Sequence, residues 1–161
     1  MAEDKRYLFE SFLSIIKAFN TYNVRYVVIG GVAVIIHGMP RLTQDLDILI
    51  EMTPENIEKL KKALKSCFND DSINEITLRD LESYSVIRYG TPEGFHLDIM
   101  ASIGEKADYN SVEIGTKEVE GIKIRVATAQ SLYELKKDAI RPEDKRDALF
   151  LESLLKNNKK T

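Results

Sequence analysis

The sequence is poor in residues that form disulfides, bind metals through sulfur or insert into membranes. Cys67 is the only cysteine among 161 residues, tryptophan is absent and histidine occurs twice. A single cysteine excludes a disulfide framework and a metal centre built from thiolates. The longest apolar run, residues 27–36, is too short to span a bilayer, and the charged opening MAEDKRYLFESF does not fit a signal peptide. We therefore expect a cytoplasmic protein with no membrane partner.

The composition is that of an ordinary globular protein, with 43% apolar and 30% charged residues and a net charge of −3. The charge is unevenly distributed. Residues 1–122 carry 13 Lys/Arg and 20 Asp/Glu, whereas residues 123–161 carry 10 and 6. A basic C-terminal part beside an acidic body could hold a polyanion such as a triphosphate, although ordinary surface variation would give the same imbalance.

Hydrophobic spacing predicts a single domain, 1–161, with a core at about 24–126 and a helical part at about 128–157. Helices are predicted over residues 7–19 and 55–68 and from Thr128 onward, with a break at Arg141-Pro142. Strands are predicted over residues 24–29, 44–51, 83–90 and 95–101 and as a pair within 111–127. A short buried helix or turn follows Gly31, and a polar connection precedes residue 83. This order predicts an α/β (α+β) fold in which helices flank a small mixed sheet.

Two aspartates stand one residue apart in the apolar strand at 44–51. Because side chains at i and i+2 share a strand face, Asp45 and Asp47 lie on one face and apolar residues on the other. The segment 95–101 repeats this pattern around Asp98. If the strands are neighbours, three carboxylates converge, and a hard cation such as Mg²⁺ would relieve their repulsion. The alternative is that each strand merely presents a polar face to solvent.

A glycine pair precedes the aspartates. Gly30 and Gly31 follow the predicted strand 24–29 and open the short helix, where a ligand can approach the backbone closely and free N–H groups can receive a phosphate. A Gly-Gly pair alone also suits a tight turn. The combination is more specific, because Gly-Gly, thirteen residues, Asp-Leu-Asp and a distant Leu-Asp-Ile would place a phosphate site opposite a carboxylate cluster.

On these residues the sequence resembles the nucleotidyltransferases of the DNA polymerase beta superfamily. Gly30, Gly31, Asp45, Asp47 and Asp98 match its signature position by position, over residues 24 to about 100. More loosely, LYELKKDAIRPEDKRDALFLESL is similar to the Arg-Pro-x-Asp-x-x-Asp helix of a small bacterial and archaeal branch. That branch includes AbiEii-type toxins and lincosamide-type antibiotic nucleotidyltransferases. Glu143 stands there where a lysine is often found.

The resemblance implies a nucleotidyltransferase fold and a metal-dependent mechanism. Asp45 and Asp47 would hold two Mg²⁺ ions, with Mn²⁺ as an alternative, that bridge the triphosphate of an NTP such as ATP. Asp98 would complete the metal site on the acceptor side and could take the proton of the acceptor hydroxyl. These three residues are therefore the predicted catalytic and metal-binding residues.

Further residues are predicted to contact the nucleotide. Arg41 and Thr43 lie in the connection just before Asp45, and Lys136 could reach the triphosphate from the C-terminal helices, as could Lys137 and Arg141. His37 lies between apolar residues and is predicted to pack rather than to bind a ligand. His96, which shares a strand face with Asp98, is predicted to be a neighbour only.

The predicted function is Mg²⁺-dependent transfer of an NMP from an NTP to a hydroxyl, with release of pyrophosphate. The acceptor could be a tRNA, a protein or a small molecule such as an antibiotic, and a homodimer or a toxin–antitoxin partner could complete the cleft. One alternative is a non-catalytic antitoxin-like or regulatory module on the same fold. Another is a metal-dependent phosphohydrolase, which the sequence favours less because it contains no His-Asp ligand motif.

Overall fold

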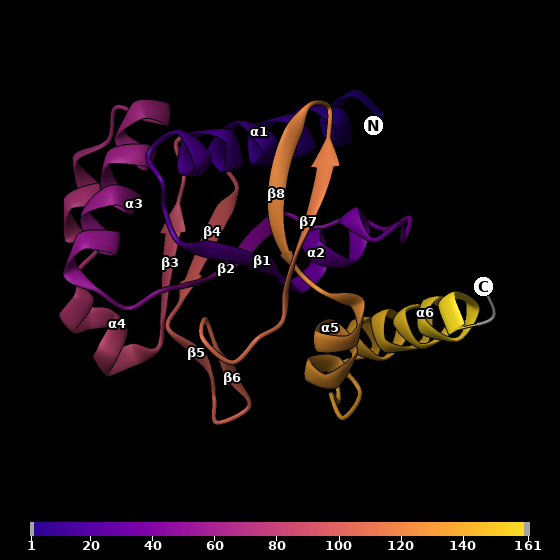
Figure 1. The fold of residues 1–161 in the computed structure, drawn as a ribbon. Helices are drawn as coiled ribbons and strands as arrows, with labels where there is room; N and C mark the ends of the chain where they lie inside the picture. Colours follow the sequence, from indigo (N-terminus) through magenta and orange to yellow (C-terminus); the bar gives the residue numbers. More distant parts are fainter. Residues whose placement is uncertain (1, 160–161) are drawn as a thin grey trace.

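The chain folds around a mixed sheet of six strands in the order β3-β4-β2-β1-β8-β7 (Figure 1). This computed structural model describes residues 2–159, with side chains from Tyr7 onward, so part of the opening on which the signal-peptide expectation rests lies outside the described residues. The strands of this sheet are β1 (Tyr26–Ile29), β2 (Asp45–Ile50), β3 (Val86–Gly90), β4 (His96–Met100), β7 (Ile114–Val119) and β8 (Ile122–Ala127).

Helices surround the sheet and fill much of the remaining chain. They are α1 (Ala2–Thr21), α2 (Gly30–Ile36), α3 (Pro54–Cys67), α4 (Leu78–Tyr84), α5 (Ala129–Lys136) and α6 (Pro142–Lys159). The first and third pack against each other, α2 packs on β1 and β2, and α5 packs along α6 (Figure 1). The predicted α/β fold with a mixed sheet is confirmed, including the helix break before Pro142.

Parallel and antiparallel pairs alternate in a way that places the aspartates centrally. Strand β2 pairs with β1 antiparallel and with β4 parallel, and β8 lies parallel to β1 on its other side. The run Val27–Ile29 is β-branched, which favours a strand. The strand ends at Ile29 and is followed by Gly30, whose φ of +70° only glycine adopts readily. The strands β1 and β2, which flank the glycine pair and carry Asp45 and Asp47, therefore lie in the middle of the sheet rather than at an edge.

The polar connection predicted before residue 83 is wrong in part, because it contains two short helical elements. A 3₁₀ helix, η1, covers Asp71–Glu75 and is followed by α4. The Thr77 hydroxyl accepts a hydrogen bond from the backbone N–H of Asp80 and caps α4. One buried apolar residue in each element, Ile73 and Leu81, anchors it to the core. Too few apolar positions recur here for helical spacing to be recognised in the sequence.

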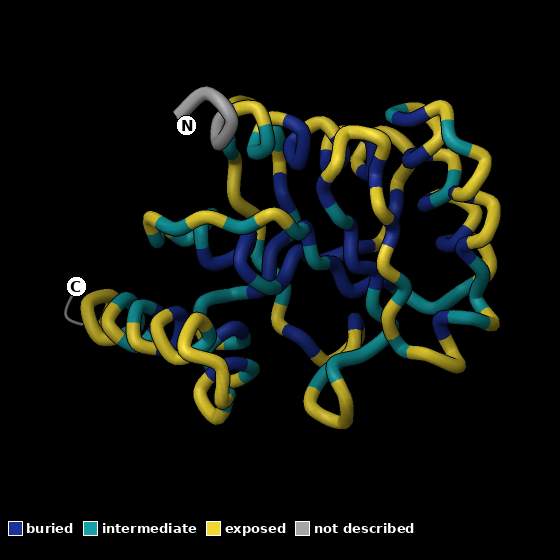
Figure 2. Tube along the Cα trace, turned by 180° about the vertical axis from the view of Figure 1, so that it is seen from behind, coloured by how far each residue is buried: buried dark blue, intermediate teal, exposed yellow. Residues whose placement is uncertain are grey.

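A small hairpin, β5 (Ser102–Ile103) with β6 (Ala107–Asp108), is also absent from the sequence-based prediction, because each strand has only two residues. It projects from the body below the main sheet (Figure 1). Figure 2 shows that burial concentrates in the sheet, whereas α6 exposes most of its outer surface. Among residues 2–159, no helix is both long and apolar enough to cross a membrane.

One buried asparagine joins the sheet to α3. Thr53 caps this helix by accepting from the backbone N–H of Asn56 at 3.1 Å. The Asn56 amide oxygen accepts from the backbone N–H of Arg25 at 2.7 Å, and its Nδ2 donates to the carbonyls of Arg25 and Glu51. These bonds hold the start of β1 beside the end of β2, at the end of the strands opposite to the aspartates.

Candidate active site

The strand pairing brings the predicted aspartates together. Strands β2 and β4 lie parallel with Asp47 opposite Asp98 and Asp45 opposite His96. Residues directly opposite one another point to the same sheet face, so the three carboxylates share one face. The apolar residues between them, such as Leu46 and Leu97, point the other way and are fully buried. The i, i+2 pattern in both strands is therefore confirmed.

Asp47 is the most perturbed carboxylate of the cluster. Burial, followed by the nearby charge of Asp98 and then that of Asp45, raises the pKa of Asp47 to about 7, while the charge of Lys136 lowers it. Its Oδ1 is buried and has no hydrogen-bond partner. A buried oxygen without a partner is costly, so this atom is poised to receive a proton or a cation.

The two glycines leave room for side chains of the site. A Cβ on Gly30 would collide with the Asp47 carboxylate, and a Cβ on Gly31 would come within 3.1 Å of Arg41 Nη2 and 3.2 Å of Thr43 Cβ. Gly30 therefore lies against a candidate metal ligand, and Gly31 lies against two predicted nucleotide-binding residues. Helix α2 begins at Gly30 without an intervening loop.

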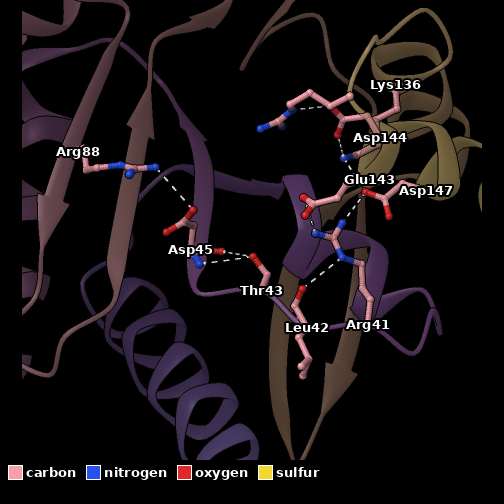
Figure 3. Close-up of polar contacts among 10 residues, drawn as sticks. Arg41, Leu42, Thr43, Asp45, Arg88, Lys136, Glu143, Asp144 and Asp147 are labelled. Carbon is pink, nitrogen blue, oxygen red and sulfur yellow. Dashed lines mark hydrogen bonds and ion pairs between the residues drawn. The ribbon is translucent and has the colours of Figure 1, made fainter.

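The strand β3 contributes an arginine that the sequence analysis missed. Arg88 Nε lies 2.9 Å from Asp98 Oδ1 and Arg88 Nη2 lies 3.1 Å from Asp98 Oδ2, a two-bond contact, and Nη2 also lies 3.5 Å from Asp45 Oδ2. His96 Nδ1 is 3.3 Å from Asp45 Oδ1. The side chain of Arg88 reaches from its strand toward Asp45 in Figure 3. Strand alternation could have indicated it, because Arg88 pairs with Asp98 across β3 and β4.

A second polar cluster joins the C-terminal helices to the sheet. Asp147 is 1% exposed, and its Oδ2 accepts from Arg41 Nη1 at 2.5 Å and from Lys136 Nζ at 2.8 Å (Figure 3). Lys136 also donates to Asp144 at 2.9 Å, and Arg141 donates to the other oxygen of Asp144 at 3.0 Å. Burial by itself raises the pKa of Asp144, but the hydrogen bonds and charges of Lys136 and Arg141 together outweigh it, and the pKa is lowered.

The predicted nucleotide-binding residues thus lie near the carboxylates, but two of them are already paired. Arg41 and Lys136 share Asp147, whose Oδ1 is buried without a partner. Glu143, the departure from the family pattern, lies 3.8 Å from Arg41. The Thr43 hydroxyl contacts the backbone of Asp45 at 3.3–3.4 Å and so shapes the entry to β2.

Other candidates lie further out or have structural roles. Lys137 pairs with Glu134 at 2.6 Å on the surface. His37 Nε2 lies 2.9 Å from the carbonyl of Ala127, and burial lowers the pKa of this imidazole. The packing prediction for His37 is therefore confirmed. The partly buried Cys67 thiol has a raised pKa, chiefly because of burial, and is not activated.

The carboxylates fit a divalent cation in part. The crowding of Asp47 with two other carboxylates and its orphaned oxygen are what a cation would relieve. Mg²⁺ in phosphate sites commonly uses one or two carboxylates together with substrate oxygens and water, which Asp45 and Asp47 can supply. In the part of the chain that the structure describes, no three His, Cys, Asp or Glu side chains form a ready metal site. Arg88 holds Asp98 instead.

Several solved structures share this fold. An antigenic nucleotidyltransferase-like protein from Paracoccidioides brasiliensis superimposes with a TM-score of 0.60 at 17% identity, over 91% of this chain and 76% of that one. The lincosamide antibiotic adenylyltransferase LnuA, with lincomycin bound, gives 0.55 at 15% identity, over 89% and 96%. A protein from Thermotoga maritima described as a nucleotidyltransferase gives 0.52 at 18% identity, over 98% and 95%. The fold is that of the nucleotidyltransferases.

The sequence specifies the family within this class. Residues 12–143 match the model of the nucleotidyl transferase AbiEii toxin family, described as a type IV toxin–antitoxin system. The chain belongs to this family and is a nucleotidyltransferase. No curated protein matches the sequence. The expected fold and class of enzyme are thereby confirmed.

Proposed function

We propose that the protein transfers an NMP from an NTP to a hydroxyl acceptor in a reaction that depends on Mg²⁺ and releases pyrophosphate. The observation that carries this proposal is the state of Asp47, which is crowded by Asp45 and Asp98 and has a buried oxygen with no partner. A cation shared with a triphosphate would satisfy this oxygen and remove the repulsion. Mn²⁺ has the same preference for oxygen ligands and could replace Mg²⁺.

Asp45 and Asp47 would hold the cation, which when bound neutralises phosphate charge and orients the triphosphate. The turn at Gly30 and Gly31 would receive the phosphates, with the Asp47 carboxylate lying against Gly30 and the Arg41 side chain against Gly31. Arg41 would contribute positive charge beside the phosphates.

Lys136 would act with Arg41 on the triphosphate. Asp147 holds both side chains in place, so their charges are positioned before the nucleotide arrives. Such preorganised charge contributes to transition-state stabilisation without the cost of reorganisation. The hydrogen bonds of Thr43 to the backbone of Asp45 would fix the start of the strand that carries the metal ligands.

On the acceptor side, Asp98 would order the hydroxyl and accept its proton as the oxygen attacks the α-phosphorus. The bond from that phosphorus to the pyrophosphate oxygen breaks in the same displacement. The acceptor is a tRNA, a protein or a small molecule, and an antitoxin or a second copy of the chain would cover the carboxylate face of the sheet.

The test combines binding with transfer. Mg²⁺ together with ATP, CTP, GTP or UTP should raise the melting temperature, with a stabilisation of about 2.7 kcal/mol at a hundred times Kd. The same nucleotide with EDTA should not match this shift. Labelled nucleotide is then offered with total tRNA, lincosamides or the protein itself as acceptor. Equal thermal shifts with and without metal, and no labelled product with any acceptor, would contradict the proposal.

A further inference from the structure

Arg88 lies on the edge strand β3 with its side chain over the carboxylate face. Cross-strand pairing places it opposite Asp98, and its guanidinium contacts both oxygens of that residue at 2.9 and 3.1 Å. The same guanidinium lies 3.5 Å from Asp45 Oδ2 (Figure 3). It therefore bridges two carboxylates that belong to two different strands.

The other cations near the site are held by different acids. Lys136 and Arg41 pair with Asp147, and Arg141 pairs with Asp144. Arg88 is thus the basic side chain that neutralises the acceptor-side carboxylate directly. A two-bond contact between arginine and a carboxylate is stronger and more directional than one made by an ammonium group.

The two side chains of this ion pair differ in their exposure to solvent. The Asp98 side chain is 11% exposed, whereas that of Arg88 is 56% exposed. The carboxylate is consequently fixed in the protein, while the guanidinium can leave into solvent without opening the core. A cation that bound Asp98 would have to displace the guanidinium, because both Asp98 oxygens accept hydrogen bonds from it.

We infer that Arg88 is a positioning residue that acts as a built-in cation on the acceptor side and competes with divalent metal for Asp98 and Asp45. This inference rests on the proposed function. In the nucleotide-free protein the guanidinium orients Asp98. It limits metal binding to the position between Asp45 and Asp47, away from Asp98. Metal then binds tightly only together with a nucleotide, whose phosphates supply further oxygen ligands.

The test measures Mn²⁺ alone, without nucleotide, by the loss of the free-ion electron paramagnetic resonance signal on titration with the full chain. Arg88→Ala should bind Mn²⁺ about tenfold more tightly than the parent, a difference of about 1.4 kcal/mol. Arg79→Ala removes the same charge from an exposed position on α4. Because distant exposed charges are screened, this control should stay within about twofold of the parent.

Two further variants make the result specific. Arg88→Lys keeps the charge but cannot contact both Asp98 oxygens in the same way, so its Mn²⁺ affinity should lie between those of the parent and Arg88→Ala. It also provides the measurement if the alanine variant does not fold. Adding Asp47→Asn to Arg88→Ala should abolish the gain, since the bound ion needs the Asp47 oxygen that has no partner.

The outcomes separate the inference from the proposed function. If Arg88→Ala and Arg79→Ala bind Mn²⁺ equally, Arg88 does not compete with metal and the inference is wrong, while Mg²⁺–nucleotide binding by the parent can still hold. If neither the parent nor the variants bind Mn²⁺ with or without ATP, the proposed function is wrong as well. Tighter Mn²⁺ binding by Arg88→Ala, with no such gain in Arg79→Ala, supports the inference and the metal dependence of the proposed function.

Discussion

Replacing Asp47 with asparagine tests whether a crowded charge lies at the centre of the site. Burial, and then the charge of Asp98, raises the pKa of Asp47 from 3.8 to about 7. The folded protein therefore keeps a proton on Asp47 at pH values where the unfolded chain has released it. Asparagine has nearly the same shape, can donate an N–H to Asp98 as the protonated carboxyl does, and never ionises.

The sign of the pH dependence follows from proton linkage. From about pH 4 to about pH 7 the folded parent binds more protons at Asp47 than the unfolded chain does, so its free energy of unfolding decreases as pH rises. The contribution is fully present below about pH 4 and is lost above about pH 7. At about 1.4 kcal/mol per pH unit the decrease is at most about 4 kcal/mol. We expect about 2 kcal/mol, because water reaches part of the side chain and screens its charge.

Urea unfolding in EDTA at about pH 3.5 and about pH 8 measures this difference. The Asp47→Asn variant and the parent should differ by less than about 0.5 kcal/mol at the lower pH, where Asp47 is largely protonated in both states, and the variant should be about 2 kcal/mol more stable at the higher pH. Asp138→Asn, at an exposed position, serves as the control for loss of a carboxylate. If Asp47→Asn is clearly destabilised at both pH values, its carboxylate is a structural acceptor and the electrostatic account of the site fails.

Three other substitutions probe separate parts of the site. Gly30→Ala places an alanine in a left-handed conformation, which costs about 1–2 kcal/mol, and its Cβ would also collide with Asp47. In urea unfolding it should therefore lose more stability than Gly121→Ala, where φ is also positive but the space around the Cβ is open. Asp98→Asn should keep most of its Mg²⁺–NTP affinity in calorimetry but lose on the order of 10²–10⁴ in pyrophosphate release; turnover above about a tenth of the parental rate would contradict its role. Asp147→Ala leaves two cations without their shared buried partner and should cost about 3–5 kcal/mol in urea unfolding, and a variant as stable as the parent would refute this.

The predictable parts of the fold and the site are those with strong local periodicity. The alternation around Asp45, Asp47 and Asp98 predicted both strands and the face that the aspartates take in each, because side-chain direction in a strand follows from spacing alone. That the two faces are one was predicted only for neighbouring strands, and the pairing of β2 with β4 meets this condition. The glycine pair was likewise recognisable, since a positive φ and a close approach both demand glycine. In the structure the side chain of Asp47 lies against Gly30 and that of Arg41 against Gly31, and the contact of these glycines with a phosphate stays a prediction.

The less predictable parts depend on long-range pairing. Arg88 was not recognised, although the strands predicted at 83–90 and 95–101 are separated by a short turn and would pair as a hairpin with Arg88 near Asp98. Asp147 stood in a recognised helix, but its pairing with Arg41 links residues 106 positions apart. Ion pairs of this kind follow from the tertiary arrangement, which spacing within a single element does not specify.

The strand order also determines when the site can form during synthesis. The aspartate on β2 meets its partner on β4 across 51 positions of sequence (98 − 47), and β1 obtains its second neighbour only when β8 is present. Closing loops of this length before any contact compensates for the lost entropy makes such pairings slow. The ribosome must therefore release residues up to Asp147 before Arg41 and Lys136 have their shared partner. The polar cluster around Asp147 consequently forms later than the carboxylate cluster of β2 and β4, which needs only residues up to Asp98.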